Sequence, residues 1–214
     1  MAQVPLFPLG TVLVPGASLP LQIFEPRYIE MLSDLVNATD VPEFGVVAIR
    51  QGHEVGADSA HDLHEVGCLA RVVQAASVGD GRYLVVSTGT RRFHLDAMAD
   101  AGTAYLTAEV TVLEERRGDE QEVADLATRL REALHRYAET LGAEQPQWPD
   151  DADELSYAVG ASVGLDLGER QQLLAAPDTE TRLRLGLRMV RREQALARTL
   201  GVVPPPPDHP WNPN

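Results

Sequence analysis

The chain contains no lysine, since all 18 basic residues among its 214 are arginines. A phosphate-binding P-loop needs a lysine, a serine–lysine dyad needs lysine as its base, and a Schiff-base enzyme needs a lysine amine. None of these three kinds of catalytic site can be built from this chain. Together with abundant alanine, glycine and proline, the exclusive use of arginine indicates a GC-rich bacterial coding bias.

Cysteine is nearly absent as well. The single Cys68 excludes an intramolecular disulfide and fits a reducing compartment. The amino-terminal segment MAQVPLFPLG has neither the basic region nor the unbroken apolar region of a signal peptide. No run approaches the roughly 20 apolar residues that cross a bilayer. We therefore expect a soluble cytoplasmic protein with no membrane partner.

Neither half of the chain is basic. The formal charge is −14, with 15 acids and 8 arginines in residues 1–117 and 17 acids and 10 arginines in residues 118–214. Each part therefore carries −7 and should repel a phosphate backbone, so we expect no nucleic-acid partner. A hydrophobic content of 44% is enough for one large domain or two small ones.

The first half of the chain is predicted to be rich in strands. Residues 4–7, 11–14 and 19–24 are short, apolar and broken by proline or glycine, which is typical of edge strands because proline cannot donate to a central ladder. A helix over 26–36 should begin at Pro26. Its apolar stripe is Tyr28, Met31, Leu32 and Leu35.

Further strand patterns lie on both sides of a polar loop over 51–65. Thr88-Gly89-Thr90 is predicted to be the turn of a hairpin. Strands that do not alternate with helices favour a small mixed or antiparallel barrel. The predicted strands are 44–50, 68–76, 82–87, 92–98 and 105–113.

Helical periodicity begins after Arg117. Asp119 is predicted as an N-cap with Glu122 three residues later, and Gly142 as the end of the helix. Its stripe is Val123, Leu126, Leu130, Leu134, Tyr137 and Leu141. Three more helices are predicted over 151–163, 167–176 and 179–200, with Asp166 and Asp178 as N-caps. The expected fold is α+β: a β-rich subdomain over 1–117, an α-helical subdomain over 118–201, and a proline-rich tail over 202–214.

Gly160, Ser162 and Gly164 match the G-x-S-x-G motif of hydrolases. That motif works on a strand–turn–helix, where strain exposes the serine. Here it lies between predicted helices, and the one downstream histidine is His209 in the tail. Small residues at helical spacing are better interpreted as sites of close helix packing.

Four residues could form a metal site. They are His53, His61, His64 and Cys68, with the spacing H-x2-H-x3-C at their core. Structural zinc sites usually take four ligands from two knuckles, and the sequence holds no second knuckle. Cys68 also fits the start of a strand as a small apolar residue. We predict no metal and no cofactor.

Arginines crowd the last predicted helix. They could bind an acidic or phosphorylated ligand, or they could neutralise the acidic stretch 150–154, which we favour. Glu25, Asp96 and Glu109 lack the spacing of a glycosidase. We predict no catalytic residue and no enzyme. The arginines are Arg182, Arg184, Arg188, Arg191, Arg192 and Arg198.

Ordered blocks over about residues 4–200 resemble one family. The segment PLFPLGTVLVPGASLPLQIFEPRY (5–28) closely resembles the start of the amino-terminal, substrate-binding domain of Lon proteases. FGVVAIRQGHEVG, LHEVGCLARV, DGRYLVVSTGTRRFHL, YLTAEVTVLEE, LSYAVGASVGLDLGERQQLL and RLRLGL resemble later blocks in the same order. The chain resembles stand-alone bacterial proteins of this kind, especially actinobacterial ones, which lack the ATPase and protease modules.

The resemblance implies a PUA-like barrel followed by a helical bundle. It also implies a non-enzymatic module that binds unfolded or damaged polypeptides, or an adaptor for a protease or chaperone, and it implies no catalytic residue. An alternative from the same fold is a PUA-like barrel that binds RNA or a small ligand, although the charge of −14 disfavours RNA. The oligomeric state stays open.

A groove between a barrel and its helical partner is the expected binding place. Large apolar residues are mostly buried, so Phe24, Tyr28 and Phe93 also fit core positions, an interpretation that we favour. Glu25 and Arg27 should make fixed polar contacts, with Arg91 or Arg92 as a partner of Glu25. The candidate groove residues are Leu6, Phe24, Tyr28 and Phe93, with Arg27 and Arg92 at the rim.

Overall fold

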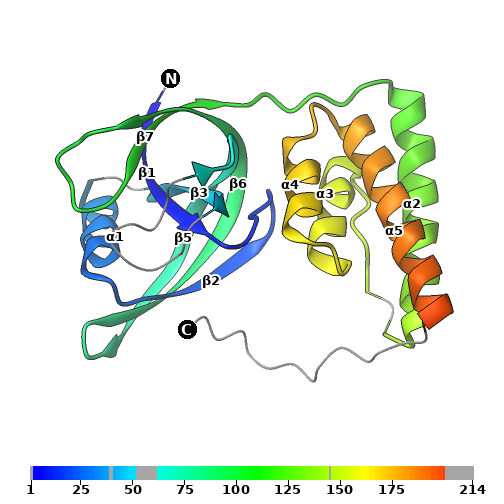
Figure 1. Ribbon diagram of the computed structural model, residues 1–214, viewed down its shortest axis with the longest axis horizontal. Helices are drawn as coiled ribbons and strands as arrows, with labels where there is room; N and C mark the ends of the chain where they lie inside the picture. Colours follow the sequence, from blue (N-terminus) through cyan, green and yellow to red (C-terminus); the bar gives the residue numbers. More distant parts are fainter. Residues whose placement is uncertain (1, 39–40, 52–61, 145, 201–214) are drawn as a thin grey trace. The chain divides into compact units, whose positions relative to one another are not determined.

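The computed structural model describes residues 2–38, 41–51, 62–144 and 146–200 and divides the chain into two units (Figure 1). The ring unit comprises Met1–Glu114 and Arg170–Ala175, and the helical unit comprises Glu115–Glu169 and Ala176–Asn214. This is a mixed α+β fold with helices in the carboxy-terminal half. The domain boundaries inferred from the sequence, at 117 and 201, stay predictions. In the described chain, no helix is long and apolar enough to span a membrane.

Five strands of the ring unit close on one another (Figure 1). Their order is β1-β7-β6-β5-β3, and a parallel pairing of β1 with β3 completes the ring. The ring strands are β1 (Ala2–Leu9), β3 (Glu43–Gln51), β5 (Val66–Gly79), β6 (Arg82–Ala99) and β7 (Thr107–Val112). Two further strands pair with it: β2 (Ser18–Ile23) with β6, and β4 (Asp62–Leu63) with β3.

The prolines of the first strands occupy positions that pair with a neighbouring strand on one side. In β1, residues 2–5 pair with β7 and residues 6–9 pair with β3, so each half of the strand has one ladder partner in the described chain. Pro5 and Pro8 therefore sit where one side of the strand is unbonded. Pro20 lies in β2, which pairs with β6. The edge-like character predicted for these segments is confirmed for β2.

The interior of the ring is filled from all five strands. Phe93 of β6 is fully buried at its centre. Burial of apolar side chains from every strand makes closure of the ring favourable, because each side chain leaves water only when the others are in place. The cluster consists of Leu6, Val47, Leu69, Phe93, Ala108 and Val110.

Helix α1 (Pro26–Ala38) covers buried side chains of the ring unit. It begins at Pro26 as predicted, and all four residues of its predicted stripe are buried. Tyr28 stacks on Phe7 of β1 with ring centroids 4.1 Å apart, and Phe7 also contacts Phe44 of β3 at 5.9 Å. An aromatic cluster thus fixes α1 to the two strands that close the ring.

Two predictions for the ring unit are wrong. Residues 11–14 form no strand; they run into a turn in which the Gly16 N–H donates to the Gly89 carbonyl. Thr88-Gly89-Thr90 is not a turn, because β6 continues without a break from Arg82 to Ala99. The hairpin between β5 and β6 turns at Asp80-Gly81, where both residues have positive φ (51° and 70°), as a two-residue turn requires.

The helical unit contains α2 (Glu120–Leu141), α3 (Ala152–Ser162), the first turn of α4 (Leu167–Ala175) and α5 (Thr179–Leu200). Helices α2 and α5 run parallel, since Glu180 contacts the Asp119 N–H near their starts and Gln194 donates to Thr140 near their ends. Four members of the predicted α2 stripe are buried, while Tyr137 and Leu141 are half-buried.

The predicted caps are confirmed. The Asp119 carboxylate accepts from the N–H groups of Gln121 and Glu122, and Gly142 ends α2 with φ of 64°. Asp166 and Asp178 accept from the N–H groups three residues later, at 2.8 and 2.7 Å. These side chains satisfy backbone donors that the helix itself cannot.

Arg184 and Arg192 of α5 pair with acids outside the stretch 150–154 that we expected α5 to neutralise. Arg184 pairs with Glu180 and Glu122, and Arg192 with Glu169 and Glu193. The acids Asp151 and Asp153 pair instead with Arg117 at 4.0 and 3.7 Å. Arg117 lies in the connection before α2 and reaches the start of α3, which no periodicity in the sequence indicates.

Candidate functional site

Four of the six candidate groove residues are buried inside the ring unit. Leu6 and Phe93 belong to the ring core, and Tyr28 lies beneath α1 against Phe7. Arg92 is also buried, and its Nη1 donates to the carbonyl of Leu174 in α4 at 2.8 Å. For Tyr28 and Phe93, the structure therefore agrees with the favoured interpretation as core residues.

The other two follow β2, with Phe24 directly after the strand and Arg27 in the first turn of α1. Phe24 is 46% exposed, so the core interpretation fails for this residue. Arg27 pairs with Glu25 at 2.9 Å and lies 4.6 Å over the Tyr28 ring, which confirms fixed polar contacts for both charged residues. Of the two expected partners of Glu25, Arg91 pairs instead with Glu43, and the pairing with Arg92 stays a prediction.

Large apolar side chains are exposed along the β5–β6 hairpin and beside it. We call this set the hairpin surface: Phe24 (46% exposed), Val73 (66%), Val78 (45%), Leu84 (50%) and Val86 (37%). Leu84 and Val86 alternate with the buried Val85, so they point away from the packed face of their strand. In the register of the sheet, Leu84 lies between Gln22 of β2 and Ala76 of β5. Val86 lies between Pro20 of β2 and Gln74 of β5.

The hairpin surface is exposed because the hairpin is longer than its neighbours. Strand β5 pairs with β3 over residues 68–71, and β6 pairs with β7 from residue 93 onward. Between these limits, β2, β6 and β5 form a three-stranded ribbon (Figure 1). Its one face carries the buried Leu21, Ile23 and Val85, and the other presents apolar side chains to solvent. Contiguous exposed apolar residues are typical of interaction sites.

A charged cluster lies where β3 begins to pair with β5. The Glu43 carboxylate accepts from Arg71 (3.1 Å), from Arg91 (3.4 Å) and from the Thr90 hydroxyl (3.3 Å). Both arginine side chains are more than half exposed, whereas Glu43 is largely covered. We call Arg71 and Arg91 the arginine pair. Two guanidinium groups sharing one carboxylate leave one positive charge without a partner acid in the described chain.

Sequence reasoning found Phe24 but missed the rest of the hairpin surface. Alternating apolar residues predict a strand with one buried face, and they do not reveal which strand extends beyond its partners. The available signal was the Asp80-Gly81 pair, the dipeptide that most favours a two-residue hairpin turn. Placing the turn there would have identified residues 73–86 as a long hairpin.

Neither chemical candidate from the sequence forms a site in the described chain. Ser162 is the last residue of α3, so the G-x-S-x-G residues lie at a helix end and not on a strand–turn–helix. His53 and His61 lie outside the described residues. Cys68 is fully buried in β5, and burial lowers the pKa of His64, with Arg50 adding to the effect. Among described residues, no group of three or more His, Cys, Asp or Glu side chains could hold a metal ion.

His94, Asp96 and Thr111 form an exposed polar triad on β6 and β7. His94 Nδ1 lies 3.0 Å from one Asp96 oxygen, and the Thr111 hydroxyl donates to the other at 2.7 Å. The hydrogen bond from Thr111, followed by that from His94, lowers the pKa of Asp96. Because His94 of the same strand and Thr111 of β7 engage both carboxylate oxygens, the triad is best understood as a structural contact that links β6 to β7.

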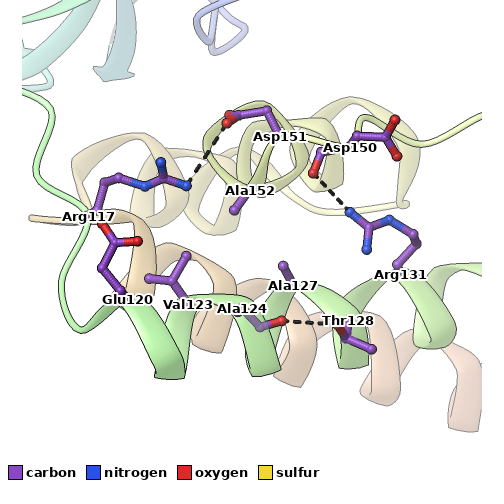
Figure 2. A pocket seen from close by; sticks show the side chains of 10 residues that line it. All are labelled: Arg117, Glu120, Val123, Ala124, Ala127, Thr128, Arg131, Asp150, Asp151 and Ala152. Atoms are coloured by element: carbon purple, nitrogen blue, oxygen red, sulfur yellow. Dashed lines mark hydrogen bonds and ion pairs between the residues drawn. The ribbon is translucent and has the colours of Figure 1, made fainter.

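A hollow of about 320 Å³ lies in the helical unit between α2 and the start of α3 (Figure 2). Arg117 and Arg131 lie at opposite ends of it. Arg131 donates to the carbonyls of Pro149 and Asp150 at 3.1 and 3.3 Å, and Arg117 pairs with Asp151. Both guanidinium groups thus hold the segment before α3 against α2. Their role is therefore structural.

Tyr105 is predicted to titrate late. Its hydroxyl donates to Asp34 of α1 at 2.9 Å, and burial together with this carboxylate raises the pKa of Tyr105 to about 12. The hydrogen bond should stabilise the fold fully below about pH 10, where an unfolded tyrosine is protonated, and be lost as the pH rises towards 12. An ultraviolet titration of the folded protein should include a late-titrating tyrosine signal that decreases by one tyrosine in Tyr105→Phe. In Asp34→Asn that tyrosine should titrate earlier; an unchanged titration would contradict the assignment.

The comparisons with known proteins agree on one family. The model of the ATP-dependent protease La (LON) substrate-binding domain matches residues 3–192. The chain therefore belongs to this family of substrate-binding domains. It is 29% identical over 209 residues to a Lon protease of Anaeromyxobacter dehalogenans, an alignment that covers 92% of this chain and 24% of that protein. The chain thus spans about a quarter of the length of this curated relative.

Two solved structures have the same fold. The Lon N-terminal domain protein from Xanthomonas campestris is 27% identical, with a TM-score of 0.64, and the match covers 86% of this chain and 96% of that one. The N-terminal domain of Lon protease from the Mycobacterium avium complex is 20% identical, with a TM-score of 0.69 and coverage of 89% and 98%. The second likeness concerns the fold alone.

Proposed function

We propose that this chain is a non-enzymatic module that binds unfolded or damaged polypeptides, and that the hairpin surface is its binding site. The observation that carries the proposal is the exposure of five large apolar side chains on and beside one hairpin. A polypeptide that has lost its fold exposes apolar segments, and it can bury them against such a surface. Membership of a family of substrate-binding domains supports the same class of ligand.

We also propose an architecture, a cellular location and a partner for this module. We place the five-stranded ring among PUA-like barrels and the helical unit among helical bundles, and we propose that the module acts in the cytoplasm as an adaptor for a protease or chaperone. The acidic charge of −14 supports a protein ligand over a nucleic acid. The exposed apolar groups lie over the uncharged residues 72–79 and 83–90, which supports a ligand recognised by apolar content.

Replacing Leu84 and Val86 together by threonine should weaken binding of an unfolded polypeptide by about tenfold or more. Threonine keeps the strand preference of the ribbon but removes apolar surface that a ligand would cover. Burying the exposed part of each side chain is worth about 0.5–1.5 kcal/mol, so two losses give about that factor. The measurement is fluorescence anisotropy of labelled, reduced and carboxymethylated α-lactalbumin titrated with the full chain.

The matched control is Met98→Thr with Val112→Thr. These residues are similarly exposed apolar positions of the same unit, on β6 and β7 outside the hairpin surface. This variant should bind like the unmodified chain. Equal loss in both variants, or no saturable binding by the unmodified chain, would refute the proposed site.

A further inference from the structure

We propose that β5 accepts an extended apolar segment as an added strand, and that the arginine pair selects segments whose carboxyl end carries a negative charge. This inference rests on the proposed function and specifies its ligand: an apolar stretch followed by an acidic residue or a free chain terminus. The ligand would form main-chain hydrogen bonds to β5 and place its carboxylate beside Arg71 and Arg91.

The outer edge of β5 is open near the hairpin tip. Strand β3 covers this edge over residues 68–71, and the Val72 N–H donates to the Pro42 carbonyl at 2.9 Å. Beyond that point, no strand of the described chain pairs with the outer side of residues 74–79. Alternate backbone N–H and C=O groups of this stretch therefore face solvent, and an extended peptide can satisfy them.

The open edge also lacks two of the usual protections, charge and proline. Residues 74–79 read QAASVG and contain no charged residue and no proline, the devices that normally block pairing with another chain. Two irregularities, at Val72/Gln74 and Ser77/Gly79, limit the regular edge to residues 74–77. A short added strand is thus favoured, with its side chains reaching the exposed Val73 and Val78.

The position of the arginine pair fixes the direction of the ligand. An added strand would lie in line with β3, because both use the same edge of β5, and it would end at Pro42, directly before Glu43. Since β3 is antiparallel to β5, a ligand running in the same direction as β3 would point its carboxyl end at Arg71. The opposite direction would bring a positively charged amino terminus to two guanidinium groups, which is unfavourable.

Charge complementarity explains why a carboxylate would be selected. Glu43 accepts from both arginines, and in the described chain it is the one acid that pairs with either of them. A second carboxylate would balance the remaining positive charge through charge-assisted hydrogen bonds. We expect the ligand carboxylate to tighten binding by about tenfold at low salt, because one charge-assisted hydrogen bond contributes about that factor. The gain should be smaller at high salt, where exposed charges are screened.

The test uses two labelled peptides that share a β-branched apolar core. One ends in aspartates with a free carboxyl terminus, and the other ends in asparagines with an amide. On the full chain the acidic peptide should bind about tenfold more tightly at low salt, and the difference should vanish in Arg71→Gln with Arg91→Gln. Arg82→Gln, a similarly exposed arginine of the hairpin that pairs with Asp80, should retain the preference. Methylation of alternate peptide nitrogens should abolish binding if the ligand adds as a strand.

The outcomes separate this inference from the proposed function. If both peptides bind equally, and Leu84→Thr with Val86→Thr still weakens them, the binding module stands and the acidic preference is overturned. If neither peptide binds, the proposed function falls as well. If single-stranded RNA binds at low salt and depends on Arg71 and Arg91, the pair is a phosphate site and the inference is overturned. Arg71→Lys with Arg91→Lys keeps the charge and should retain part of the preference, which excludes misfolding as the cause of a loss.

Discussion

Replacing Arg182 by methionine is expected to destabilise the helical unit by about 3 kcal/mol. This arginine of α5 is fully buried. Its Nε donates to the Ser156 hydroxyl at 2.7 Å, and its Nη2 donates to Thr179 at 3.2 Å and to Glu115 at 3.3 Å. The guanidinium also lies 3.9 Å over the Tyr157 ring. Methionine fills similar volume without a charge, so the loss reports the polar network.

The size of this effect depends on the polar groups that lose the Arg182 guanidinium as a partner. Removal of the guanidinium leaves the buried Ser156 hydroxyl without the Arg182 donor, and it removes an ion pair from Glu115. Removing one partner of a buried ion pair costs about 3–5 kcal/mol, and the Glu115 side chain is 41% exposed, so water compensates part of its charge. The expected value therefore lies at the lower end. Urea unfolding of the full chain, followed by Trp148 fluorescence, measures it.

Arg184→Met is the matched control, two residues away on the same helix. Arg184 is 57% exposed and pairs with Glu180 at 2.7 Å and Glu122 at 3.6 Å. Exposed ion pairs contribute about 0–1 kcal/mol, so this variant should lose about 0.5 kcal/mol. Similar losses in the two variants would show that burial of Arg182 contributes nothing specific, contrary to the structure.

The sequence predicted the helical unit well because helix signals are local. Asp119, Asp166 and Asp178 act on backbone groups two or three residues away, and Gly142 ends α2 by its own conformation. Helix α5 spans the predicted residues for the same reason. Ion-pair partners are not local. Arg117 takes Asp151 and Asp153, a choice that depends on how the connection before α2 runs in space.

The ring was harder to predict because its defining contacts are distant in sequence. The parallel pairing of β1 with β3, which closes the ring, leaves no periodic signal. The candidate site suffered similarly, since Phe24 and Phe93 are both aromatic residues next to strand patterns, yet one is exposed and the other is the centre of the core. The family resemblance, carried by ordered blocks of sequence, pointed to the class of ligand, whereas the hairpin surface required the structure.

Gly89→Ala should destabilise the ring unit by about 3 kcal/mol. The sequence suggested a turn at this glycine, but the structure gives it a different role inside β6. An ideal Cβ there would lie 2.2 Å from the Val14 carbonyl oxygen and 3.0 Å from its carbon. The Val14 segment cannot easily retreat, because the Gly16 N–H donates to the Gly89 carbonyl and the Gly89 N–H donates to the Ala17 carbonyl, both at 2.9 Å. Overpacking costs about 1–3 kcal/mol, and a backbone clash lies at the upper end.

Two further variants decide whether the backbone clash is the cause. The same Cβ would lie 3.2 Å from Cys68 Sγ, so Gly89→Ala combined with Cys68→Ala relieves the sulfur contact but not the carbonyl contact. Relative to Cys68→Ala alone, the double variant should therefore still lose most of the stability. Gly164→Ala places a methyl group where, in the described chain, no atom lies within 4 Å, and it should change stability by no more than about 0.5 kcal/mol. If the double variant is instead nearly as stable as Cys68→Ala alone, the clash is with Cys68. That result would contradict the role given to the Val14–Ala17 turn.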